Sequence, residues 1–251
     1  MLQRLFDRAY IPAQRPVLVH ARLRGLHQQT GEDYAQLSES LLHCLLSCQP
    51  ELLLIPSYTI YSFLLGRVFQ RELSRSEVGR FSEELRQRGF TRTSDPMYSM
   101  LDILDRLPAG LDYAATLGAN TLCNYLHQVD ALIVNIDMPG FYATPIHSIE
   151  LEQAVPYRHQ RQIVGQVQLG DLPWRGVNYR AYLRSVGADG AAFPPYNQQR
   201  RLDYLRERGV VREAEHNGVR LTWAPLVDFS RAISEALQQN RCFLVDDPMA
   251  T

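Results

Sequence analysis

The stretch VLVHARLRGLHQQTGEDYAQLSESLLHCLLSCQPELLLIP (residues 17–56) decides the fold class, because it sets a short apolar run on each side of an amphipathic segment. VLVH (17–20) and ELLLIP (51–56) have the length and composition of buried strands. Between them, GEDYAQLSESLLHCLLSC (31–48) has the apolar spacing of a helix. This order indicates βα units around a largely parallel or mixed sheet.

Short apolar runs and amphipathic segments continue to alternate along the chain. After residue 56 the pattern predicts helices at 74–89, 120–127, 143–154, 198–209 and 227–240, strands at 98–104, 130–136 and 161–169, and a hairpin at 210–225. The helix at 74–89 has a serine start signal, and Asn217-Gly218 suits a type I′ turn in the hairpin. Residues 171–199 are rich in Gly, Pro and Tyr, and we expect a helix within functional loops there.

The length of 251 residues suits one large α/β domain or two small ones. No linker or internal repeat divides the sequence. We therefore expect a single α/β domain over residues 1–251, with a mixed sheet flanked by helices, a C-terminal helix, and residues 170–225 inserted on the substrate side.

The composition excludes several classes of function. The formal net charge is −1, which gives no overall attraction to nucleic acid or to an anionic membrane. All 26 basic residues are arginine, so no lysine is present to form a Schiff base or act as a general base. No segment approaches the roughly 18 apolar residues that span a bilayer, and the N-terminus lacks the apolar run of a signal peptide. We expect a soluble, cytoplasmic protein.

The four cysteines are scattered along the sequence, and we expect buried free thiols with no metal site: Cys44, Cys48, Cys123 and Cys242. Cys123 as a covalent nucleophile is an alternative, but it lies in an apolar helical pattern that indicates a core position.

A histidine and a glutamate lie one helical turn apart in TPIHSIELEQAVPYR (144–158). On a helix, His147 and Glu150 share a face and reach each other. A carboxylate beside an imidazole fixes its tautomer and stabilises the imidazolium, as a general base requires. Spacing alone also fits an ordinary surface pair or a satisfied interior pair.

Four motifs in order resemble the aminoglycoside 3-N-acetyltransferase family, also called antibiotic N-acetyltransferases. They are VLVHARLRGL (17–26), LLLIPSYT (52–59), SEVGRFSEELRQRGFTRTSDPMYS (76–99) and TPIHSIELEQAVPYR (144–158). The resemblance covers roughly residues 15 to 165. It implies an α/β fold with a mixed sheet, acetyl-CoA as cosubstrate, and direct transfer of the acyl group to an amine.

The resemblance also implies roles for single residues. The family's Thr-x-Leu-His-x-x-Glu motif matches Thr144, Ile146, His147 and Glu150, with His147 as general base and Glu150 as its orienting partner. Thr144 either donates a hydrogen bond to the developing oxyanion or caps the helix. Arg158 either holds Glu150 or binds a phosphate of a ligand.

For the donor, the family pattern points to the first loop and to the turn before the helix at 74–89. The expected contacts are His20, Ala21, Arg22, Leu23, Ser76, Val78 and Gly79. The family usually has two serines where this chain has Ala21 and Arg22, so the arginine replaces a phosphate contact by charge. The alternative for Ser76 to Gly79 is a simple helix start.

The acceptor side departs further from the family. Asp95 stands where the family usually has a histidine, and it either changes the charge beside the amine or starts a turn before Pro96. We also expect Tyr98, Tyr157 and Arg158 near the acceptor. Arginines dominate the region that follows: Arg158, Arg161, Arg175, Arg180, Arg184, Arg200, Arg201, Arg206, Arg208 and Arg212. This balance disfavours a polycationic aminoglycoside and favours an amino sugar on a nucleotide or an amino acid derivative, unless these arginines form a solvated face.

The leading hypothesis is therefore an acyl-CoA-dependent N-acetyltransferase whose partners are coenzyme A and a small amine, with neither nucleic acid nor membrane. A homodimer is left open. One alternative is a weakened family member that binds coenzyme A or acts as a scaffold. Another treats residues 198–225 as a helix and wing that contact nucleic acid, which the negative net charge disfavours.

Overall fold

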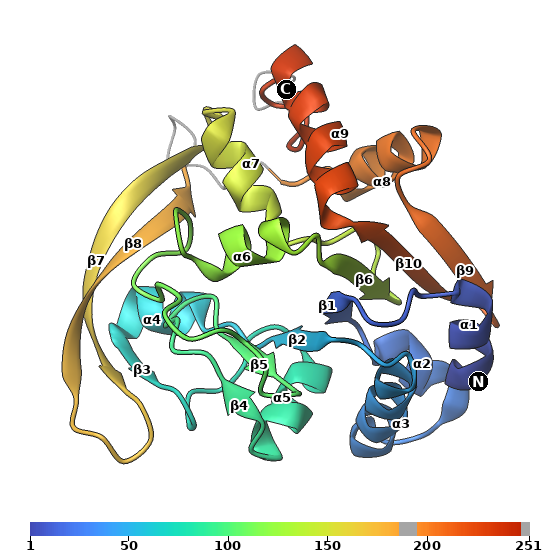
Figure 1. The fold of residues 1–251 in the computed structure, drawn as a ribbon, viewed down its shortest axis with the longest axis horizontal. Coiled ribbons are helices and arrows are strands. Elements are labelled where there is room, and N and C mark those ends of the chain that lie inside the picture. The colour runs from blue at the N-terminus through green and yellow to red at the C-terminus, as the bar shows by residue number, and fades with distance from the viewer. Residues whose placement is uncertain (186–194, 247–251) are drawn as a thin grey trace.

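Three apolar strands pair in parallel at the centre of the computed structural model, which describes residues 1–185 and 195–246 (Figure 1). β1 (Pro16–Ala21) pairs with β2 (Leu52–Pro56) on one side and with β6 (Leu132–Ile136) on the other. Antiparallel strands extend both edges, giving the order β4-β5-β2-β1-β6-β10-β9. The outer strands are β4 (Thr91–Arg92), β5 (Met100–Asp102), β9 (Arg212–His216) and β10 (Val219–Pro225). The predicted mixed sheet is confirmed.

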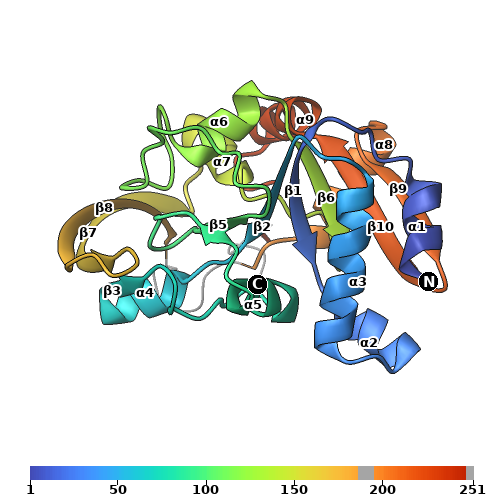
Figure 2. The same ribbon diagram turned by 60° about the horizontal axis from the view of Figure 1, so that its bottom comes forward.

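The sheet is buried on both faces, which explains why its central strands are continuously apolar. Alternate residues of β1 enter different cores, with Leu18 on one face and Val17 and Val19 on the other. One face is covered by α1 (Leu2–Ala9), α2 (Arg24–Thr30), α3 (Tyr34–Ser47) and α5 (Arg80–Gln87). The opposite face is covered by α4 (Ile60–Gly66), α6 (Leu122–Gln128), α7 (Ile146–Glu152), α8 (Gln198–Glu207) and α9 (Leu226–Gln239). Figure 2 shows the strands between α6, α7 and α9 and the helices α3 and α5.

A second sheet of three strands stands beside the first, at the left of Figure 1. β7 (Arg158–Gln168) forms a long antiparallel hairpin with β8 (Arg175–Arg184), and β3 (Val68–Gln70) pairs in parallel with β7. The helix expected within residues 171–199 was wrong for residues 175–184, which form β8 because they pair with β7. The burial there alternates as in a strand, with buried Tyr179 and Ala181 on either side of exposed Arg180. Residues 186–194 of that segment lie outside the described residues.

The expected serine start of the helix at 74–89 was also wrong, since α5 begins at Arg80. The Ser74 hydroxyl accepts a hydrogen bond from the Gln70 amide and closes a turn. Glu77 accepts hydrogen bonds from the Tyr61 and Ser62 amides, so this loop satisfies the start of α4. Sequence reasoning missed α1, α2, α4, β3 and β4, which are all short.

The remaining predicted elements are confirmed within a few residues of their expected ends. Asn217 and Gly218 both have positive φ, at 51° and 72°, as a type I′ turn between β9 and β10 requires. The segment 170–225 divides between the sheets, with β8 in the second and β9 and β10 in the first.

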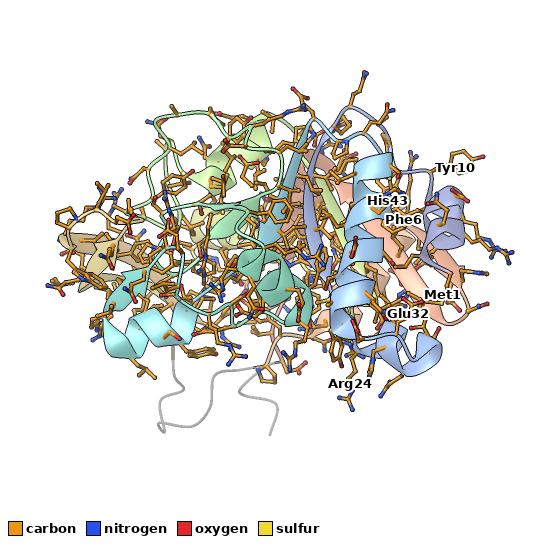
Figure 3. All side chains as sticks on the ribbon, turned by 90° about the horizontal axis from the view of Figure 1, so that it is seen from below. Met1, Phe6, Tyr10, Arg24, Glu32 and His43 are labelled. Carbon is orange, nitrogen blue, oxygen red and sulfur yellow. The ribbon has the colours of Figure 1, made fainter. Side chains whose placement is uncertain are left out.

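The N-terminal helices form the end of the molecule opposite β7 and β8. Figure 3 shows them with Phe6 of α1, Arg24 of α2 and His43 of α3 labelled. Their apolar side chains belong to the core beneath the main sheet. Within the described residues, no helix combines the length and the apolar character needed to cross a bilayer.

Gly165 allows β7 to lie close to Phe63 of α4 and to Arg67, which follows α4. A Cβ at this position would lie 2.7 Å from the Arg67 carbonyl oxygen and 2.7 Å from the Phe63 ring. We expect Gly165→Ala to lower the free energy of unfolding by about 2 kcal/mol, because the fully buried Phe63 cannot move aside. Urea unfolding followed by circular dichroism measures the change.

Gly176→Ala is the matched control, because Gly176 lies on β8 in the same hairpin and its Cβ would meet no atom within 4 Å. This control should change stability by no more than about 0.5 kcal/mol. Equal losses in the two variants would contradict the close approach of β7 to α4.

Candidate active site

A cavity of about 770 Å³ opens where the carboxyl ends of β1 and β2 face the second sheet. His20 and Ala21 come from β1, and Ile55 and Pro56 come from β2. Helices α4, α5, α7 and α8, strands β7 and β8, and several loops form the rest of the wall. This position agrees with the general rule that ligands of open α/β sheets bind beyond the carboxyl ends of the strands.

His147 lies in the first turn of α7, on the cavity wall. Its Nδ1 is 2.7 Å from Oε2 of Glu150, which is fully buried one turn further along the helix. The other ring nitrogen, Nε2, has one long contact, at 3.5 Å from Nη2 of Arg158. The structure therefore brings together the histidine and glutamate that the sequence placed on one helix face.

Glu150 is the meeting point of three donors. Besides His147, it accepts a hydrogen bond from the Tyr196 hydroxyl at 2.7 Å and pairs with the Arg158 Nε at 2.8 Å. Arg158 also donates to the Tyr182 carbonyl and to the Tyr196 hydroxyl. Burial by itself would raise the pKa of Glu150, but the hydrogen bond from His147 and the charges of His147 and Arg158 lower it. Glu150 is therefore a carboxylate at neutral pH, and Arg158 holds it in place.

The environment of His147 keeps its imidazole neutral at pH 7. Burial lowers the pKa of His147 below its usual 6.5, and the charge of Arg158 lowers it further. The carboxylate of Glu150 acts in the opposite direction. A neutral imidazole with hydrogen on Nδ1 has its lone pair on Nε2, which is the atom able to accept a proton.

Thr144 does not cap α7, where no side chain bonds to the first turn. Its hydroxyl hydrogen-bonds to the Tyr58 hydroxyl on the cavity wall. Burial raises the pKa of Tyr58 well above its ordinary value, so Tyr58 stays protonated and is able to donate to Thr144. The Tyr98 ring lies edge-on to His147, with ring centroids 6.0 Å apart.

Only part of the expected donor set lines the cavity. His20, Ala21 and Val78 do, whereas Arg22 points to Asp137 with a closest distance of 4.0 Å. Leu23 is buried in the core. Neither Ser76, whose amide donates to Glu83, nor Gly79 before α5 is on the wall.

Two residues expected near the acceptor lie behind the wall. Asp95 is buried and accepts hydrogen bonds from the Met97 and Tyr98 amides and from the Tyr179 hydroxyl, so it closes a turn. Burial raises its pKa to about 6. Tyr157 is buried and does not line the cavity, unlike Tyr98 and Arg158.

Sequence reasoning missed Tyr58 and Tyr196 entirely. It noted the arginine-rich region but could not select its members. The guanidinium groups on the wall are those of Arg67, Arg158, Arg161, Arg184 and Arg201. Among the described residues that line the cavity, none is Asp or Glu, so the surface that a ligand meets is cationic.

The cysteines contribute no nucleophile to this wall. Cys44 and Cys123 are buried free thiols, and Cys48 and Cys242 are half-buried. Burial raises the pKa of Cys123 to about 12, so its thiol is protonated at neutral pH. In the part of the chain that the structure describes, no three His, Cys, Asp or Glu side chains converge as metal ligands would.

Several solved structures of aminoglycoside acetyltransferases have this fold. A mutant of AAC(3)-IVa in complex with gentamicin gives a TM-score of 0.71 at 16% identity, over 99% of this chain and 91% of that chain. AAC(3)-IIb gives 0.69 at 15% identity, over 95% and 96% of the two chains. AAC-IIIb in a binary complex with CoASH gives 0.67 at 12% identity, over 98% and 97%. No protein-family model and no curated protein matches the sequence. At these identities the likeness establishes the fold, and the expected resemblance in fold is confirmed.

The neighbours of His147 predict opposite pKa changes in two variants. Arg158→Gln should raise the pKa of His147, because it removes a positive charge that favours the neutral ring. Glu150→Gln should lower it, because it removes the carboxylate that favours the charged ring. The pKa is measured by NMR titration of the histidine side chains, with His147→Ala assigning the signal. Shifts of the same sign in both variants would contradict this electrostatic arrangement.

Proposed function

We propose that the protein is an acyl-CoA-dependent N-acyltransferase that moves an acetyl or other acyl group from coenzyme A to a primary amine. One observation supports this most strongly: His147, bonded to the buried Glu150, stands on the wall of a large cavity, in a fold shared with enzymes that have been solved with CoASH and with an aminoglycoside. The volume of about 770 Å³ is within the usual range for small-molecule sites.

The proposed reaction is a direct transfer within a complex of both substrates. The amine nitrogen attacks the thioester carbonyl carbon, and Nε2 of His147 accepts the proton that the nitrogen loses. Glu150 stabilises the resulting imidazolium through Nδ1. The tetrahedral oxyanion then collapses, the carbon–sulfur bond breaks, and the thiolate leaves and takes up a proton. No covalent enzyme intermediate is required.

Thr144 is the proposed donor to the oxyanion. Its hydroxyl lies on the cavity wall three residues before the base and is paired with the Tyr58 hydroxyl. With Tyr58 donating to Thr144, the hydrogen of Thr144 is free to point at the thioester oxygen as it gains charge.

The donor is proposed to lie along α4, where Ile60, Leu64 and Leu65 offer an apolar wall for the pantetheine arm. Arg67 and Arg161 also line this cavity and are more exposed than Arg201, so they are suited to phosphates near the solvent. Of the contacts expected from the family pattern, Ala21 and Val78 remain in this proposal, and His20 lies on the wall of the same cavity.

The acceptor is proposed to be an amine that also carries negative charge, such as an amino sugar derivative or an amino acid derivative. Aminoglycosides are polycations and would meet a wall of guanidinium groups. The segment 170–225 is assigned to the substrate side, because it supplies Tyr182, Arg184, Tyr196 and Arg201 to the wall.

Thiol release from acetyl-CoA tests the function. With a panel of amino sugar nucleotides, amino acids and aminoglycosides, we expect release that depends on an anionic amine, and His147→Gln should lower kcat by about 10²–10⁴-fold. His159→Gln is the control, because His159 lines the same cavity and its side-chain hydrogen bond among the described residues is to the Ser185 hydroxyl, away from Glu150. It should keep kcat within a few-fold.

Two outcomes would contradict the proposal. Coenzyme A binding without release for any amine would favour a binding or scaffold protein. Equal losses in the two histidine variants would remove His147 from the role of base.

The oxyanion role predicts a specific kinetic pattern. Thr144→Val preserves shape but removes the hydroxyl, and it should lower kcat by about 10²-fold with little change in the KM for acetyl-CoA. Tyr58→Phe should cause a smaller loss of kcat, because the Tyr58 hydroxyl orients Thr144 and does not itself contact the oxyanion in this proposal. A Thr144→Val variant with normal kcat, or with a change confined to KM, would contradict the role.

A further inference from the structure

One arginine on the cavity wall is buried without a carboxylate partner. Arg201 lies in α8 with 4% exposure, and it donates to the Gln198 side chain and stands over the Tyr142 ring, 5.9 Å from its centroid. Its Nε has no hydrogen-bond partner. Among the described residues, no Asp or Glu lies within 4.0 Å of its guanidinium group.

Arg92 shows how the same fold treats a structural arginine. Arg92 is also 4% exposed, and burial lowers the pKa of both groups to about 10. Its nitrogens donate to the Ser99 hydroxyl and to the carbonyls of Ser57, Arg71 and Ser74. A buried guanidinium without such partners costs stability. The unpaired guanidinium group of Arg201 is therefore suited to bind an anionic group of a ligand.

A second buried polar atom without a partner lies on the same wall. The Nε2 of His20 at the end of β1 has no hydrogen-bond partner, and the His20 ring stands 6.5 Å from the Tyr142 ring that Arg201 covers. Burial and the charge of Arg201 lower the pKa of His20 to about 3. A neutral imidazole with hydrogen on Nε2 is a donor that does not titrate at working pH.

The position of Arg201 relative to His147 indicates which of the two substrates carries the anionic group. The charge of Arg201 also lowers the pKa of His147, so the guanidinium lies within electrostatic reach of the proposed base. The phosphates of coenzyme A are separated from its thioester by the long pantetheine arm, and therefore lie far from the reacting atoms. An anion beside the base thus belongs to the acceptor.

We propose that Arg201, supported by Gln198 and by Nε2 of His20, binds a carboxylate or phosphate group of the acceptor and so selects anionic amines. This proposal rests on the acyltransfer function proposed above. It names the binding residue for the acceptor, where the pattern of the sequence indicated only a region rich in arginine.

The test uses inorganic phosphate and acetate as probes, with saturating coenzyme A to occupy the donor phosphate sites. We expect each probe to shift the imidazole NMR signals of His20 in the wild type, and Arg201→Met to weaken binding at least tenfold while its affinity for coenzyme A stays within twofold. Arg180→Met is the control, since Arg180 is exposed on β8 and paired with Asp112 at 3.0 Å. It should bind both probes like the wild type.

Thermal unfolding separates a binding arginine from a structural one. Arg201→Met should leave Tm unchanged or raise it, whereas Arg92→Met should lower Tm by roughly 5 °C or more, because four acceptors lose their donor. A fall in Tm for Arg201→Met as large as that for Arg92→Met would overturn the proposal.

Other results would also overturn it: no probe-dependent shift in the wild type, unchanged probe binding in Arg201→Met, or loss of coenzyme A binding in that variant, which would assign the guanidinium to the donor. If the probes bind as expected but no amine releases thiol from acetyl-CoA, the acyltransfer function fails while the anion site stands.

Discussion

The buried carboxylate of Glu150 is the constraint on which the site depends. A fully buried charge is tolerated only when donors surround it, and Glu150 has three: His147 from its own helix, Arg158 from the first residue of β7, and Tyr196 from the segment before α8. These donors come from separate parts of the chain. One carboxylate therefore fixes how α7, the second sheet and the segment before α8 meet, and the cavity lies where they join.

This arrangement keeps the carboxylate of Glu150 away from the cavity and places arginines on the cavity wall. Glu150 stays behind the wall, while Arg158 and the other guanidinium groups reach the surface of the cavity. The same charges act on His147, because Arg158 and Arg201 both favour its neutral form. An imidazole with a lowered pKa is a weaker base but is mainly neutral at pH 7, and the carboxylate of Glu150 favours its protonated form. The cavity thus combines a neutral imidazole with a cationic wall.

The sequence could predict features that depend on neighbours along the chain. The three-residue spacing of His147 and Glu150 set both side chains on one helix face, and the apolar runs identified β1, β2 and β6. It could not decide between the two roles of Arg158, because Glu150 and Tyr196 approach it only after the second sheet is packed. The same holds for β8, whose strand conformation comes from its ten-residue register with β7 rather than from its own composition. Arg201 is one of ten arginines in its region by sequence, and only burial without a partner distinguishes it.

Asp95 and Arg22, two departures from the family pattern, contact other protein groups in the structure. Asp95 was a candidate for holding a cationic amine, but its oxygens are used by two backbone amides and the Tyr179 hydroxyl behind the wall. Arg22 was a candidate for a phosphate contact, yet it faces Asp137 at the rim. Neither change therefore sets the charge that a substrate meets. That charge comes from five arginines, of which Arg67, Arg158 and Arg161 lie within the region of resemblance at residues 15 to 165, whereas Arg184 and Arg201 lie beyond it. The region of resemblance therefore supplies His147, Glu150 and three of these arginines, and the later part of the chain adds the other two to the same wall.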